Sequence, residues 1–129
     1  MRTIYSSYIE AWKRKQAEEE RELKTLKEEA FALAKKVCSL LVKKYGATKV
    51  VLFGSAVKGR WSRDSDIDLG VEGIGKEVFI KVLVETEELI GRSVDIKPLE
   101  ECKGFFKERI EKEGVVLYED QRRNHYSNC

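Results

Sequence analysis

The sequence contains few of the residues that build disulfide, zinc or nucleophilic sites. Its 129 residues include one histidine, one proline and three cysteines. Cys38, Cys102 and Cys129 are odd in number, far apart and outside any C-x-x-C pair, which argues against a disulfide framework and a zinc site. The single histidine, His125, stands in a polar tail, which argues against chemistry based on histidine. Any catalysis must therefore come from carboxylates, hydroxyl groups, lysines or metal ions.

Long apolar runs and a strong charge of one sign are also lacking. The longest apolar runs, 50–53 and 115–118, are far shorter than the ~20 residues that span a bilayer. No signal-peptide pattern is found, so we expect a soluble cytoplasmic protein without a membrane segment. The net charge of +2 gives no support for nucleic-acid binding. Hydrophobic residues make up 42% of the chain, which is enough for the core of one domain.

The first third of the chain is free of proline and glycine and rich in helix formers. Residues 6–44 predict one long amphipathic helix, or two helices with a polar break at Gln16 and Glu19. We expect the part from 30 to 41 to pack on the domain core. The N-terminal part has only a narrow apolar stripe and carries three aromatic residues, Tyr5, Tyr8 and Trp12. We expect it to dock on a second subunit, giving a homodimer, or on a helical partner.

The rest of the chain alternates between strand and helix patterns. We predict strands at 49–53, 66–72, 93–97 and 115–118, and helices at 76–90 and 101–113. The inward residues of these two helices are expected to be Val78, Val82 and Leu89, and Phe105, Phe106 and Ile110. The order of elements predicts an α/β (α+β) layer domain over 46–120, with 1–45 as a helical extension and 121–129 as a disordered tail.

Three aspartates form the most informative pattern. Asp66 and Asp68 are two residues apart on a predicted strand, so both carboxylates project from the same face. Asp95 stands in the next strand and can meet them if the two strands are neighbours. Carboxylates held together repel each other unless a cation lies between them, and Mg²⁺ or Mn²⁺ prefer such oxygen ligands. The pattern indicates a two-metal site for phosphoryl or nucleotidyl transfer.

A Gly-Ser pair precedes these aspartates. Gly54 and Ser55 follow a buried strand and begin a short helix, where backbone N–H groups can bind phosphate. Glycine allows a close approach of the backbone, and the serine hydroxyl adds a donor. Nearby cations could add positive charge for a triphosphate, although each alone is typical of a surface: Lys58, Arg60 and Arg63. Trp61 either stacks on a base or packs over the turn.

Gly54-Ser55, ten residues and then Asp66-Ile67-Asp68 resemble the signature of the minimal nucleotidyltransferase group of the DNA polymerase beta-like nucleotidyltransferase superfamily. The run from Ser65 to Leu69 is typical of it, and Val94-Asp95-Ile96 resembles the segment with its third acidic residue. The resemblance covers roughly residues 47–118. It implies the polymerase beta-like fold, with a small mixed sheet, flanking helices and here a long N-terminal helix.

The resemblance also implies an activity and its residues. Members transfer a nucleoside monophosphate from a nucleoside triphosphate, here expected to be ATP, to a hydroxyl and release pyrophosphate. Asp66, Asp68 and Asp95 would be the catalytic residues and hold two Mg²⁺ or Mn²⁺ ions. The expected nucleotide-binding residues are Gly54, Ser55, Lys58, Arg60 and Ser65. Minimal members commonly pair as antitoxins with all-helical HEPN proteins, and some adenylylate a tyrosine of that partner. The alternative is a non-catalytic antitoxin that neutralises a helical partner by contact alone.

Overall fold

The computed structural model describes residues 3–120, so the predicted disorder of 121–129 lies outside the described part. The chain opens with one uninterrupted helix, α1 (Ile4–Tyr45), which resolves the choice between one helix and two. The Thr3 hydroxyl accepts a hydrogen bond from the Ser6 N–H at its start. Gly46, in the left-handed conformation, closes its end and donates its N–H to the last turn.

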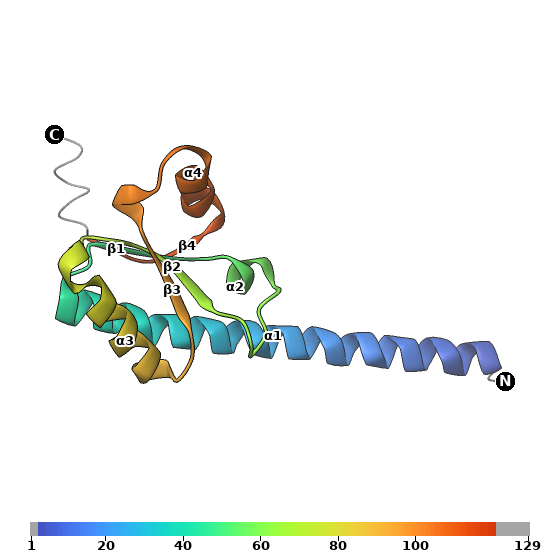
Figure 1. Cartoon of the computed structure of the whole chain (residues 1–129). Coiled ribbons are helices and arrows are strands. Elements are labelled where there is room, and N and C mark those ends of the chain that lie inside the picture. Colours follow the sequence, from blue (N-terminus) through green and yellow to red (C-terminus); the bar gives the residue numbers. More distant parts are fainter. Residues whose placement is uncertain (1–2, 121–129) are drawn as a thin grey trace.

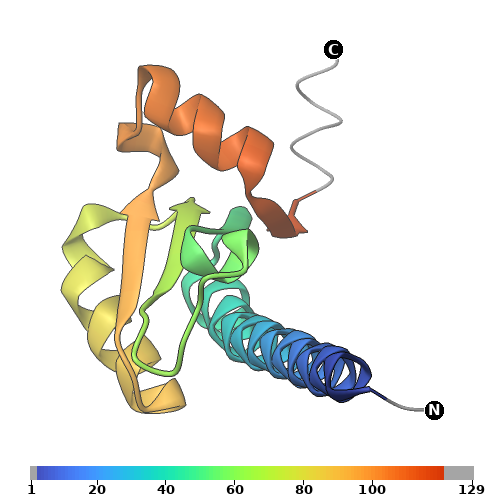
Figure 2. The ribbon, with the colours of Figure 1, turned by 90° about the vertical axis from the view of Figure 1, so that its right-hand side faces the viewer.

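A four-stranded mixed sheet follows (Figures 1 and 2). The strands are β1 (Lys49–Phe53), β2 (Ile67–Glu72), β3 (Val94–Pro98) and β4 (Val115–Glu119), in the order β3-β2-β1-β4. β1 pairs antiparallel with both β2 and β4, whereas β2 and β3 are parallel. A parallel pair needs a long crossover, and the helix α3 (Phe79–Ile90) provides it.

Helices cover the two faces of the sheet unequally. α1 and α3 lie on one face and α4 (Gly104–Glu113) lies on the other, while the short α2 (Ser55–Lys58) follows β1 (Figure 1). Two 3-10 turns precede α3 and α4, at Lys76–Val78 and Leu99–Glu101. The predicted mixed sheet with flanking helices and a long N-terminal helix is therefore confirmed.

The main core lies between the sheet and α1 and α3. The part of α1 from Ala30 to Leu41 packs there, as predicted, with Ala30, Ala34 and Val37 fully buried. A smaller cluster joins Val51 to α4 through Leu99 and Ile110. Both clusters follow from the period-two alternation of β1, which buries successive residues on opposite faces.

Two predicted helix faces need correction. On α3, Val82 is buried, but Leu89 is 49% exposed and Thr86 takes the inward position instead. On α4, Ile110 is buried, but Phe105 is 85% exposed and Phe106 is 47% exposed. The reason is that α4 begins only at Gly104 and contacts the sheet mainly through its second half. Its first turn therefore stands beyond the sheet surface.

Within residues 3–120, every helix is too short or too polar to cross a membrane.

Candidate active site

Two neighbouring strands bring the predicted carboxylates to one end of the sheet. Asp68 of β2 is the direct partner of Asp95 of β3 in the parallel register, so these two strands are neighbours, which is the condition under which Asp95 can meet the other aspartates. Asp66 stands just before β2. Because Ile67 and Leu69 point into the core under α1 and α3, Asp68 points to the opposite face, where α4 lies.

The carboxylates lie within electrostatic reach of one another. Three causes together raise the pKa of Asp68 from 3.8 to about 6: burial, which is the largest, and then the negative charges of Asp95 and Asp66. Lys97 acts in the opposite direction, and its Nζ lies 3.7 Å from Oδ1 of Asp95. Sequence reasoning missed Lys97, although its place two residues after Asp95 puts it on the same strand face.

The donor set fits a divalent cation of the Mg²⁺ type. In the described chain, no three Asp, Glu, His or Cys side chains stand in a ready-made metal geometry. However, Asp66, Asp68 and Asp95 offer only carboxylate oxygens, and their mutual repulsion is relieved when a cation lies among them. After burial, this repulsion is the second cause of the raised pKa of Asp68. A bound cation would lower this pKa again by favouring the ionised form.

Gly54 lies against Asp68, for a reason that the sequence does not show. Its backbone is left-handed at φ 74°, and a Cβ placed there would overlap Oδ2 of Asp68. Gly54 is therefore required for the position of the carboxylate, whether or not a phosphate also approaches it. A Gly54→Val substitution would displace Asp68 and would not test phosphate binding alone.

The other predicted nucleotide-binding residues follow Gly54 along the chain. Ser55 begins α2, and Lys58 ends it with Nζ 3.9 Å from a carboxylate oxygen of Glu113. Arg60 is exposed in the loop after α2. The Ser65 hydroxyl accepts a hydrogen bond of 3.0 Å from the Ser62 N–H, which folds the loop just before Asp66.

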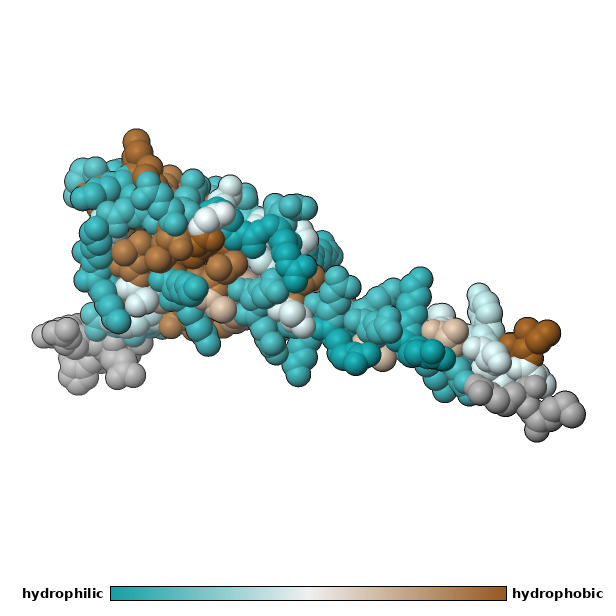
Figure 3. Space-filling view, turned by 90° about the horizontal axis from the view of Figure 1, so that it is seen from below, coloured by the Kyte–Doolittle hydropathy of each residue, from teal (hydrophilic) through white to brown (hydrophobic). Residues whose placement is uncertain are grey.

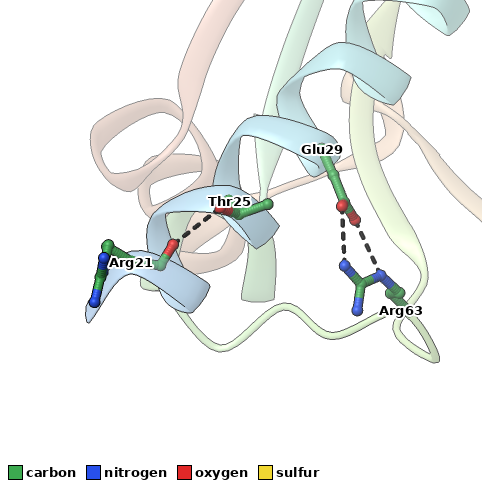
Figure 4. Close-up of polar contacts among 4 residues, drawn as sticks. All are labelled: Arg21, Thr25, Glu29 and Arg63. Atoms are coloured by element: carbon green, nitrogen blue, oxygen red, sulfur yellow. Dashed lines mark hydrogen bonds and ion pairs between the residues drawn. The ribbon is translucent and has the colours of Figure 1, made fainter. Parts of the chain in front are cut away.

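Two anchors hold this loop. Arg63 donates two hydrogen bonds to Glu29 of α1, at 3.0 and 3.3 Å, so it ties the loop to the helix (Figure 4). This pairing also raises the pKa of the Arg63 guanidinium. Trp61 is buried and lies under the guanidinium of Arg92, 4.7 Å from the ring centre, so it packs over the turn and is not free to stack on a base.

A cavity of about 210 Å³ adjoins Gly54 on the α4 side. Its walls come from the end of β1, from α2 and from α4: Phe53, Gly54, Val57, Lys58, Phe106, Arg109, Ile110 and Glu113. Phe53 and Phe106 meet edge to face with ring centres 6.4 Å apart. This cavity was not predicted, because its two aromatic walls are far apart in the sequence and only the fold joins them.

Gly54 thus lies between the Asp68 carboxylate on one side and the cavity on the other. A family model described as "Polymerase beta, Nucleotidyltransferase" matches residues 35–123. The chain belongs to this nucleotidyltransferase family. The matched range contains all of the predicted site residues and leaves the first 34 residues of the chain outside.

Named relatives of this nucleotidyltransferase support its assignment to the family. It is 31% identical to the Methanocaldococcus jannaschii protein "Putative protein adenylyltransferase MJ0435" over 64% of this chain and 91% of that protein. It is 29% identical to "Putative protein adenylyltransferase MJ1547" of the same organism, over 56% of each. A solved structure of a "putative minimal nucleotidyltransferase" is 30% identical, with a TM-score of 0.57 over 74% of this chain and 95% of that one. The resemblance to minimal nucleotidyltransferases is confirmed.

The fold also recurs in a toxin–antitoxin complex. A chain of a structure described as "the toxin-antitoxin with AMP-PNP" superposes with a TM-score of 0.60 over 71% of this chain and 78% of its own length, at 18% identity. At this identity the likeness concerns the fold.

Proposed function

We propose that this nucleotidyltransferase moves AMP from ATP to a hydroxyl group and releases pyrophosphate. The observation that carries the proposal is the pairing of Asp68 with Asp95 across two parallel strands, beside Gly54 and with Asp66 one residue upstream of β2. Asp66, Asp68 and Asp95 would hold two Mg²⁺ or Mn²⁺ ions. When bound there, such ions would lower the pKa of the attacking hydroxyl and stabilise the negative charge of the leaving pyrophosphate.

The chain's own groups have separate tasks in this reaction. The acceptor oxygen forms a bond to the α-phosphorus, and the bond from that phosphorus to the bridging oxygen of the pyrophosphate breaks. Asp95 takes up the hydroxyl proton. Gly54 and Ser55 bind the triphosphate through the backbone and hydroxyl. Lys58, Arg60 and Ser65 add donors on the same loop.

We further propose that the nucleoside part of ATP occupies the cavity next to Gly54. Gly54 lines this cavity, so a triphosphate bound at Gly54 would have its nucleoside end within reach of the cavity. Phe53 and Phe106, which meet edge to face, give this cavity aromatic walls that suit an apolar, planar base. Arg109 and Lys58 at the rim suit the phosphate end.

The acceptor in our proposal is a protein hydroxyl, namely that of a tyrosine of a HEPN-type helical toxin. Two relatives are named as protein adenylyltransferases, and the fold recurs in toxin–antitoxin complexes. The body also exposes apolar side chains on α3, with Ile80 78% and Val84 50% exposed at a spacing of one helical turn. Figure 3 shows apolar side chains gathered on this side of the body. Such a strip suits the apolar face of a partner helix.

The test is transfer of label from ATP that is labelled at the α-phosphate, with Mg²⁺, to a HEPN-type partner from the same cell. Label on the partner supports the proposal, and label that disappears when the partner's tyrosines are replaced identifies the acceptor. If the partner is neutralised without label, even with Mn²⁺, the chain acts as a contact antitoxin and the proposed activity is wrong.

A further inference from the structure

The N-terminal half of α1 projects from the body as a free rod. Residues 4–25 extend for about 33 Å at the rise of an α-helix (Figure 1). Their apolar side chains are exposed, with Ile4 at 91%, Tyr8 at 75% and Trp12 at 54%. In space-filling view the rod is narrow and mostly hydrophilic and ends in an apolar tip (Figure 3). The family match begins only at residue 35, so the family's fold does not account for this segment.

The exposed apolar stripe continues the face of α1 that is buried in the body. From the N-terminus, the stripe runs in alternating steps of four and three residues: Tyr5, Ile9, Trp12, Gln16, Glu19, Leu23, Leu26 and Ala30. Its last members, Leu26 and Ala30, already contact the sheet side of the protein. A partner that covers the stripe must therefore lie along α1 and stop where the body begins.

We propose that the occupant is a second copy of this chain, with the two α1 helices antiparallel and the two-fold axis between Ala17 and Glu18. In this register, apolar residues face apolar ones and polar residues face polar ones. Trp12 faces the partner's Leu23, Ile9 faces the partner's Leu26, and Gln16 faces the partner's Glu19. The amide of Gln16 can donate to that carboxylate. A shift by one heptad would place Ile9 or Leu23 opposite Glu19, so the stripe selects one register.

The surface of α1 already has a hollow at the place where this register puts the partner's Trp12. Glu19, Glu22, Leu23 and Leu26 surround a depression of about 320 Å³ on the rod. Four residues at this spacing form the hole that receives one knob of a facing helix. By symmetry, each Trp12 enters the hole of the other chain, which removes both indoles from water.

The charges beside the stripe are self-complementary in the same register. In an antiparallel pair the positions on one side of the seam face their own kind, so Lys13 meets the partner's Glu20 and Lys15 meets the partner's Glu22. Each pair occurs twice. A parallel pair is excluded for a different reason. It would bring Glu19 against its own copy and would drive each helix into the sheet that covers the other from Ala30 onward.

The experiment is sedimentation equilibrium of the full chain and of two charge-reversed variants, K13E/K15E and E20K/E22K. The unmodified chain should sediment at twice the mass of one chain at tens of micromolar. Each variant alone should be monomeric, because all four seam pairs become repulsive. An equimolar mixture of the two should restore the dimer, because every pair is again attractive. Circular dichroism checks that both variants keep the helix, which is expected for exposed positions.

Orientation is tested with the variants Gln16→Cys and Glu19→Cys, with the unmodified chain as control for the native cysteines. Oxidation of the mixture should cross-link residue 16 to residue 19 of the other chain. A monomeric full chain, a dimer indifferent to both charge reversals, or Gln16→Cys that cross-links mainly to itself would each overturn the proposal. No step uses ATP, so the outcome is independent of the proposed transfer reaction.

Discussion

The two faces of the sheet differ in what they bury. The face under α1 and α3 is continuously apolar, with Leu52, Ile67 and Leu69 fully buried. The face under α4 is apolar at Val51 and Phe53 of β1 and gives way to Asp68 and Asp95 on β2 and β3. β2 serves both faces, because its residues alternate between core and site. Residues that stabilise the fold and residues proposed for the reaction therefore lie on opposite faces of the same strand. A substitution at one position of β2 should affect stability, and a substitution at the next position should affect activity.

The largest effect should come from neutralising the acidic end of the α4 face. The double substitution Asp66→Asn and Asp68→Asn keeps the side-chain size but removes two charges that would hold metal ions. Transfer of label should fall by orders of magnitude, while the melting temperature stays the same or rises because carboxylate repulsion is relieved. Undiminished transfer would show that these residues do not carry the reaction.

A substitution one residue further along should have the opposite profile. Leu69→Ala removes a fully buried side chain from the α1 face and should lower the free energy of unfolding by about 2–5 kcal/mol. Activity per folded molecule should change little, since Leu69 points away from the carboxylates. Urea denaturation and label transfer on the same sample measure the two effects. A loss of activity without a loss of stability would remove the distinction between the faces.

The raised pKa of Asp68 predicts how the α4 face responds to pH. Because the folded pKa of about 6 exceeds the ordinary 3.8, the folded protein binds more protons than the unfolded chain between these values. The contribution of Asp68 to stability is therefore full below about pH 4 and is lost as the pH rises through 6. In metal-free protein, the melting temperature should show this decline, and Asp68→Asn should abolish it.

The same titration should appear in catalysis with the reverse sign. A protonated Asp68 cannot serve as a carboxylate ligand, so at a Mg²⁺ concentration too low to saturate the site, transfer should fall as the pH drops below about 6. Saturating Mg²⁺ should move this fall to lower pH, because a bound cation favours the ionised carboxylate. A rate profile that stays flat from pH 8 to 5 would contradict this prediction.

The smallest effect is expected at the cavity. Phe106→Ala removes a wall of the proposed nucleoside site and should weaken ATP binding several-fold, with little change in stability because this side chain is 47% exposed. Phe105→Ala is the matched control, because the ring of Phe105 is next to Phe106 in the sequence but is 85% exposed and lies outside the cavity lining. Equal ATP affinities of the two variants in calorimetry would mean that the base binds elsewhere.

Much of this organisation could be predicted from the sequence. The strands carry either uninterrupted apolar runs or strict alternation, and the spacing of Gly54 and Ser55 from Asp66 and Asp68 predicted a site before any strand was paired. The neighbourhood of Asp95 needed only one assumption, that β2 and β3 are adjacent. Local pattern and short spacing therefore sufficed for these features.

Features that depend on long-range packing could not be predicted. Periodicity placed Phe105 inward, but only the start of α4 beyond the sheet decides its exposure. Likewise, Gly54 looked like a phosphate-binding glycine, whereas its φ and its contact with Asp68 show a steric requirement within the protein. The Phe53–Phe106 contact joins residues more than fifty positions apart.

Lys97 places a positive charge beside the carboxylates at the acidic end of the sheet. Its ammonium group lies 3.7 Å from Asp95 and also favours the ionised form of Asp68, so the carboxylates have a covalently attached counter-ion. If Asp95 ligates a metal ion as proposed, the incoming cation would compete with this ammonium for the carboxylate. Metal uptake would then exchange one cation for another, and the displaced Lys97 side chain would be free to meet the phosphates.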